Sequence, residues 1–106
     1  MTMTMSMSDQ VRRVFDADRR LTCLRILCEG GGRASSSTLE KSLRLFSFGR
    51  VDRASTNADV RWLAAAGLVE TEELRPDLLA VTISARGERV ARGEEFIEGV
   101  SRPSRD

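Results

Sequence analysis

Residues 51–87 read VDRASTNADVRWLAAAGLVETEELRPDLLAVTISARG, and this stretch decides the fold. Its first part is rich in helix-forming residues and stops at Gly67, because glycine commonly ends a helix. Two runs of strand-forming residues follow, separated by Arg75-Pro76-Asp77, where proline presets φ for a tight turn. Ser84 then offers an N-cap for a further helix. The stretch therefore predicts the order helix, strand, turn, strand, helix.

Two more helices are expected before this stretch. Apolar residues that recur every three or four positions predict the first helix from Asp9 to Glu29, with Ser8 as its N-cap. Charged residues interrupt that period, so a bend or break is expected near Asp18. The glycines at 30–32 then end the helix. A second amphipathic pattern predicts a helix from Ser36 to Phe46, which a short turn joins to the third helix.

The chain of 106 residues is long enough for one domain with a single core. A disordered N-terminal tail is expected over residues 1–8, where methionine alternates with threonine and serine. The domain itself is expected over residues 9–97, with a last helix from Ala85 to Ile97. Residues 98–106 are rich in Arg, Ser and Pro, and they are expected to form a flexible C-terminal tail.

The composition excludes most catalytic sites. The chain has no His and no Tyr, and none of its Ser or Cys residues stands in a nucleophile motif, so no enzyme activity is expected. Cys23 and Cys28 lie five positions apart on the first predicted helix, so their Cα atoms are roughly 8–9 Å apart, too far for a disulfide. Since imidazole and further thiolate ligands are lacking, neither a metal site nor a cofactor is expected. The sequence shows no membrane span and no signal peptide, which predicts a cytoplasmic protein.

Three helices, with a short turn between the second and the third, followed by a two-stranded hairpin, are typical of a winged helix-turn-helix domain. The expected fold class is therefore mainly α with a small β-hairpin (α+β), in which a three-helix core carries a two-stranded wing and a C-terminal helix. In helix-turn-helix proteins the second helix of the turn lies in the major groove of DNA. Here that helix is expected to begin after Asp52, its N-cap, and to end at Gly67.

The candidate DNA-binding residues lie on the third helix and on the two segments that flank it. Asparagine can pair with adenine and arginine with guanine, each through two hydrogen bonds. The candidates for reading base edges are Arg53, Asn57 and Arg61. Phosphates are bound by arginines, hydroxyls and the free N–H groups of a helix start. The candidates for phosphate contacts are Arg50, Ser55 and Arg75.

An ordinary solvated helix face is the alternative interpretation of these residues. The net charge is only +1, from 17 basic and 16 acidic residues. A basic surface therefore requires that the fold gather basic residues on one side of the domain. Asp59 on the third helix, and glutamates at 70, 72 and 73 on the first hairpin strand, oppose DNA. The outward face of the helix carries small side chains at Ala54, Ala58 and Ala65. Small side chains let the helix backbone come close to DNA. We expect weak non-specific affinity that dimerisation strengthens.

Residues 59–69, DVRWLAAAGLV, look like the helix that runs into the wing in regulators of the ArsR and MarR superfamilies. The segment TISARG at 82–87 resembles the Leu-Thr-x-x-Gly motif that closes their wing. More narrowly, DRRL at 18–21, the hairpin and GVSRPS at 99–104 resemble a small uncharacterised winged-helix family of Mu-like phages and prophages. This resemblance implies a DNA-binding role and supplies no activity. It does not imply metal regulation, because the paired Cys or His ligands of metal-sensing relatives are absent from the third helix.

The expected function is therefore a DNA-binding transcriptional regulator of phage or prophage origin, with double-stranded DNA as its partner. A homodimer is expected through the first and the last helix, because the first helix is longer than a three-helix core requires. The alternative is a winged-helix module for protein interaction or assembly that does not bind DNA, which the near-neutral charge favours.

Overall fold

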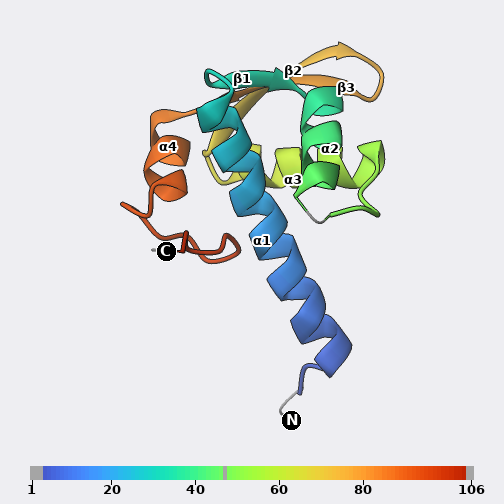
Figure 1. Ribbon diagram of the computed structural model, residues 1–106, viewed down its shortest axis with the longest axis vertical. Coiled ribbons are helices and arrows are strands. Elements are labelled where there is room, and N and C mark those ends of the chain that lie inside the picture. The colour runs from blue at the N-terminus through green and yellow to red at the C-terminus, as the bar shows by residue number, and fades with distance from the viewer. Residues whose placement is uncertain (1–3, 47, 105–106) are drawn as a thin grey trace.

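The computed structural model describes residues 4–46 and 48–104. Within these residues the chain is an α+β domain in which the helices lie on one side of a small antiparallel sheet (Figure 1). The helices are α1 (Met7–Glu29), α2 (Ser36–Leu45), α3 (Arg53–Ala65) and α4 (Ala85–Ala91). The strands are β1 (Arg33–Ser35), β2 (Val69–Arg75) and β3 (Leu78–Ile83). None of the described helices is long and apolar enough to cross a membrane.

The first helix begins earlier than its sequence pattern predicts and runs without a break. Ser6, not Ser8, caps it by accepting a hydrogen bond from the backbone N–H of Asp9, so Met7 and Ser8 belong to the helix and not to a tail. The predicted bend near Asp18 is wrong, because α1 is continuous from Met7 to Glu29. Its N-terminal half extends away from the other elements, while its C-terminal half lies against them (Figure 1).

The sheet contains a strand that the sequence pattern does not predict. β1 has only three residues, and it pairs antiparallel with β3, so that the strand order is β1-β3-β2. The glycine turn after α1 brings it there, since the Gly32 carbonyl accepts a hydrogen bond from the N–H of Ile83. Ser35 ends this strand and caps α2 by accepting from the N–H of Thr38. Such a short strand has no period of its own that could reveal it.

The predicted hairpin is confirmed. β2 pairs with β3 from Val69 opposite Ile83 to Arg75 opposite Leu78, with one irregularity between Glu73 and Arg75. The turn is tight, and Asp77 takes a left-handed conformation with a φ of 64°. β3 lies mostly inside, whereas all of β2 except Val69 is exposed, so β2 forms an outer edge of the sheet.

The core consists of aliphatic side chains from the C-terminal half of α1, from α2, α3 and the sheet. The largest fully buried side chains of the described residues include Leu24, Leu27, Leu39, Leu43, Leu63 and Leu68. Full burial of such a side chain stabilises a fold by about 1.5–3 kcal/mol. These leucines fix α3 between α2 and the hairpin, and this arrangement positions the candidate interface.

The last helix is shorter than predicted. It ends at Ala91 instead of Ile97, because Gly93 takes a φ of 79°, which turns the chain out of the helix. Val90 and Ala91 are buried, so the apolar face of α4 is covered within the chain by its contact with α1.

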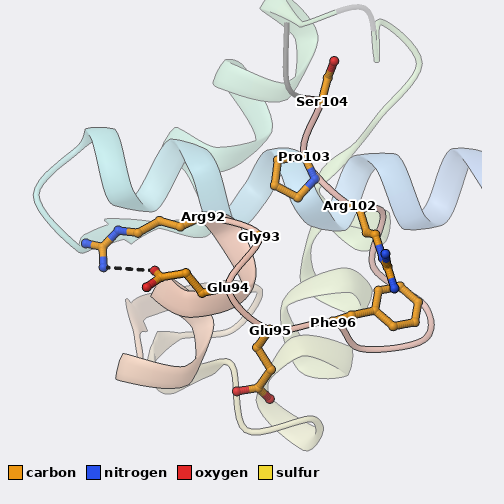
Figure 2. Close-up of a pocket in the computed structure, with 8 residues that line it drawn as sticks. All are labelled: Arg92, Gly93, Glu94, Glu95, Phe96, Arg102, Pro103 and Ser104. Carbon is orange, nitrogen blue, oxygen red and sulfur yellow. Dashed lines mark ion pairs between the residues drawn. The ribbon is translucent and has the colours of Figure 1, made fainter.

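The segment after α4 packs against the domain instead of forming the expected flexible tail. Val100 is buried, and the N–H of Ser101 donates to the carbonyl of Ala17 on α1. The guanidinium of Arg102 lies over the ring of Phe96, 4.4 Å from its centre, and both residues line a pocket (Figure 2). The described residues are thus packed up to Ser104, and the last two residues of the predicted tail, 105–106, lie outside the described part of the chain.

Candidate nucleic-acid interface

The start of α3 is held by a capping box. The Asp52 carboxylate accepts a hydrogen bond from the N–H of Ser55 at 2.8 Å, and the Ser55 hydroxyl accepts one from the N–H of Asp52 at 3.1 Å. The bond from the Ser55 backbone lowers the pKa of Asp52. This confirms the predicted N-cap. It also shows that the Ser55 side chain, a candidate phosphate ligand, is already used to hold the helix start.

One face of α3 is open to solvent, as the sequence pattern predicts. Ala54, Ala58, Arg61 and Ala65 are exposed, so no described segment covers them. Thr56, Val60 and Leu63 are buried in the core, on the other side of the helix. The side chains on the open face are therefore small, apart from Arg61, which lies at the middle of the face.

Asn57 does not belong to this open face, and its predicted role in reading bases is wrong for the described conformation. It is only 2% exposed, and its side-chain N–H donates to the carbonyl oxygen of Asp77 at 3.1 Å. The hairpin folds back so that its turn lies against the N-terminal part of α3, which covers Asn57. A buried amide in this position cannot reach a base edge. Its contact instead fixes the hairpin turn relative to α3.

Arg53 is also engaged within the domain. Its guanidinium pairs with the Glu40 carboxylate on α2 at 2.7 Å, and it donates to the carbonyl of Asp77 at 3.4 Å. Glu40 pairs in addition with Arg44 at 2.7 Å. Arg53 thus shares the single Glu40 carboxylate with Arg44, and it ties α2, α3 and the hairpin turn together.

The remaining three candidates are free. Arg50 in the turn before α3, Arg61 on α3 and Arg75 at the end of β2 are exposed. None of the three forms a hydrogen bond or an ion pair with another described residue. Arginines without a partner keep all of their hydrogen-bond donors available for a phosphate or a base.

Acidic residues face solvent on the strand that leads to this turn. Glu70, Glu72 and Glu73 are all exposed on β2. Only Glu72 has an ion-pair partner among the described residues, the guanidinium of Arg33 at 3.4 Å. The unpaired positive charge near α3 therefore comes from Arg61 on the helix and from Arg50 and Arg75 on its flanks, whereas the outer strand of the hairpin is acidic.

A buried ion-pair cluster lies on the opposite side of α3. The Asp59 carboxylate is 3% exposed and bonds Arg19 of α1, while Arg20 lies 3.6 Å away. The bond to Asp59 raises the pKa of Arg19. Asp59 therefore fastens α3 to α1, and the expectation that it opposes DNA on the open face is wrong, because the residue is buried on another side of the helix. One sequence signal points to this role. Positions 18–20 carry charged residues within the apolar period of α1, which indicates that charged partners lie near the core there.

Arg20 joins the C-terminal segment to the same cluster. Its guanidinium lies 4.1 Å from the centre of the Trp62 ring and donates to the carbonyl of Gly99 at 3.1 Å. A Cβ atom at Gly99 would lie 2.5 Å from the Trp62 ring, so only glycine fits this approach. These contacts explain why the segment after α4 is packed. No group of His, Cys, Asp or Glu among the described residues could hold a metal ion.

The fold and this site define a small α+β domain with an exposed helix and an adjacent hairpin. The chain is 34% identical to uncharacterized protein gp26 of Escherichia phage Mu over 93 residues, which cover 88% of this chain and 95% of gp26. It belongs to the family of phage Mu gp26, and this confirms the predicted relation to Mu-like phages. Neither a protein-family model nor a solved structure matches the chain.

Proposed function

We propose that this protein is a winged-helix DNA-binding protein, a transcriptional regulator of phage or prophage origin. In this proposal α3 enters the major groove and the β2–β3 hairpin is the wing that contacts the DNA backbone. The observation that carries the proposal is the open face of α3, with Arg61 at its middle and the hairpin turn bonded to its N-terminal part.

The shape of α3 supports this placement. A helix is about 10–12 Å wide with its side chains, and the major groove of B-DNA is about 12 Å wide. Ala54, Ala58 and Ala65 add little width on the open face, so the helix axis can come close to the base edges. The exposed large apolar side chains of the described residues lie on other elements, not on α3.

The free arginines have distinct roles in this proposal. Arg61 reads a base edge, with guanine as its preferred partner. Arg50 and Arg75 flank the helix and bind phosphates. Asn57 acts indirectly, because it holds the hairpin turn through the Asp77 carbonyl. Arg53 contacts DNA only if it leaves Glu40, so its contribution is small.

The charge distribution sets the expected affinity. Two phosphate contacts per chain give a slope of log affinity against log salt of about −1.8, and a dimer that uses both chains doubles it. The acidic face of β2 limits further contacts. Non-specific binding is therefore weak at physiological salt and measurable at low salt.

Fluorescence anisotropy of a labelled duplex, titrated with protein at several salt concentrations, tests the proposal. Arg75→Ala should lower the affinity and reduce the slope by about 0.9 for each phosphate contact it removes. Arg13→Ala is the matched control, because Arg13 is also exposed but lies on the projecting half of α1, far from α3 in sequence. Equal slopes for wild type and Arg75→Ala, with binding intact, would remove the hairpin from the interface.

A protein-assembly module is the second candidate, and the acidic outer strand of the hairpin favours it. Glu70 and Glu73 form no ion pair with a described residue, so they could meet a basic partner protein. In this case the folded protein binds no duplex even at low salt.

A further inference from the structure

The apolar residues of α1 occupy two different faces of the helix. Cys23, Leu24 and Leu27, in the C-terminal half, are buried in the core. Met7, Val14 and their neighbours, in the N-terminal half, are exposed, with 79% and 60% of their surfaces accessible. At about 100° per residue these two groups lie on roughly opposite sides of the helix. The interruption of the apolar pattern near Asp18 is therefore the point at which the apolar residues change from one side of the continuous helix to the other.

The exposed apolar face continues into a groove. The apolar stripe of the N-terminal half consists of Met7, Val11, Val14 and Phe15. On the same helical face, the C-terminal half forms the floor of a groove from Asp18 to Glu29. The walls of this groove are the end of α2 and the segment 101–104, which lie on either side of α1 (Figure 1). Its volume is about 980 Å³.

The walls of the groove leave large apolar side chains exposed. Leu45 at the end of α2 is 83% accessible and Phe46 is 58% accessible, although both line the groove. A folded domain rarely leaves such a contiguous apolar surface open unless a partner covers it. Two surfaces of matching direction therefore exist on one chain. One is the projecting apolar stripe, and the other is a groove with exposed apolar walls, whose floor also carries Asp18, Arg25 and Glu29.

We infer that a second copy of this chain covers both surfaces. The stripe from Met7 to Phe15 is about 12 Å long and the floor from Asp18 to Glu29 about 17 Å long, so the floor can hold the stripe. If two α1 helices cross antiparallel near Asp18, each stripe lies over the floor of the other copy. This is a closed two-fold arrangement, in which the same surface is used on both chains.

The other surfaces and the charge agree with this pairing. The expected participation of α4 is not needed, because its apolar residues Val90 and Ala91 are buried in their own chain. The net charge of +1 per chain causes little repulsion between copies. Each Asp18 lies near the two-fold axis and accepts a hydrogen bond from Ser101 of its own chain. The inference does not rest on DNA binding.

Sedimentation equilibrium of the full chain without DNA tests the inference. The wild type should sediment as a dimer, with about twice the chain mass of 11.8 kDa. Val14→Asp in the stripe and Leu45→Glu in the groove wall should each raise the dimer dissociation constant by about 100-fold or more, because symmetry places each buried charge in the interface twice. Both side chains are exposed in the single chain, so far-UV circular dichroism should show intact folds.

Arg13→Ala is the control, because Arg13 lies on the α1 face away from the stripe and should leave the dimer unchanged. A wild type that is monomeric at high micromolar concentration overturns the inference. A dimer that survives either of the two charge substitutions also overturns it. Because no DNA is present, these outcomes are independent of whether the protein binds a duplex.

Discussion

Gly87→Ala should destabilise the protein, although alanine favours a helix over glycine. Gly87 lies in the first turn of α4, and its N–H donates to the Ser84 hydroxyl at 3.0 Å. A Cβ atom here would lie 2.1 Å from the carbonyl oxygen of Leu68 and 2.8 Å from the side chain of Ile83. A normal contact requires a shift of about 1 Å between two backbone segments, which a packed interior resists.

The size of the effect follows from three contributions. Helix propensity favours alanine by about 1 kcal/mol. Overpacking costs about 1–3 kcal/mol. The Leu68 carbonyl also accepts a hydrogen bond from the N–H of Ser84 at 3.0 Å, and losing this bond costs a further 1–3 kcal/mol or so. The free energy of unfolding should therefore fall by about 1–5 kcal/mol, which lowers Tm by roughly 5–25 °C in a domain of this size.

Urea and thermal unfolding, followed by far-UV circular dichroism, measure this change. Gly49→Ala is the matched control, because a Cβ atom there meets nothing within 4 Å. The control should change the stability by less than about 1 kcal/mol. If Gly87→Ala is as stable as the wild type or more stable, the close approach of α4 to the start of β2 is not as described.

Three further changes are expected. Asp59→Ala should lower the free energy of unfolding by about 3–5 kcal/mol in the same urea assay, because it leaves Arg19 without its buried partner. Asn57→Ala should cost about 1 kcal/mol of stability and weaken duplex binding in anisotropy titrations without changing the salt slope, because it frees the Asp77 carbonyl but removes no phosphate contact. Burial raises the pKa of the Cys23 thiol from 9.0 to about 12. As the pH rises above 9.0, the thiol ionises in the unfolded chain while it stays protonated in the folded one. The unfolded state is thereby favoured, and the stability of the fold falls between these two pH values. Unfolding measured over this range should show the wild type losing stability relative to Cys23→Ala.

Local signals predicted the part of the fold that contains the candidate interface. Asp52 and Ser84 are N-caps as expected, and Pro76 stands in the hairpin turn. Each of these features depends on residues three or four positions away, so a single sequence reveals it. The end of α4 was missed because Phe96 and Ile97 continue the apolar pattern, whereas the left-handed Gly93 ends the helix.

The site was predicted less well because its side chains are placed by distant segments. Asn57 falls on the open face by helical period, yet the Asp77 turn, 20 residues later, covers it. Asp59 looks like a surface charge until α1 supplies Arg19, 40 residues earlier. Arg61, by contrast, meets no other segment, and its exposure follows from the period alone.

The change of face within α1 shows the same limit. A broken period predicts a bend when one chain is considered alone. The described helix is continuous, and its N-terminal stripe is exposed instead of buried in its own core. An apolar pattern does not tell whether its residues pack in their own chain or against a second one. The pattern alone therefore does not distinguish a bent helix from a continuous helix that changes its apolar face.

The proposed function requires the open face of α3 to contact DNA. Its most direct test is a series of ¹⁵N–¹H correlation spectra of the protein, titrated with a short duplex at low salt. The largest shift changes should occur at the backbone amides of Ala54, Ala58, Arg61 and Arg75, with none along the stripe from Met7 to Phe15. Shift changes confined to α1 and its groove, or no change at any duplex concentration, would contradict it.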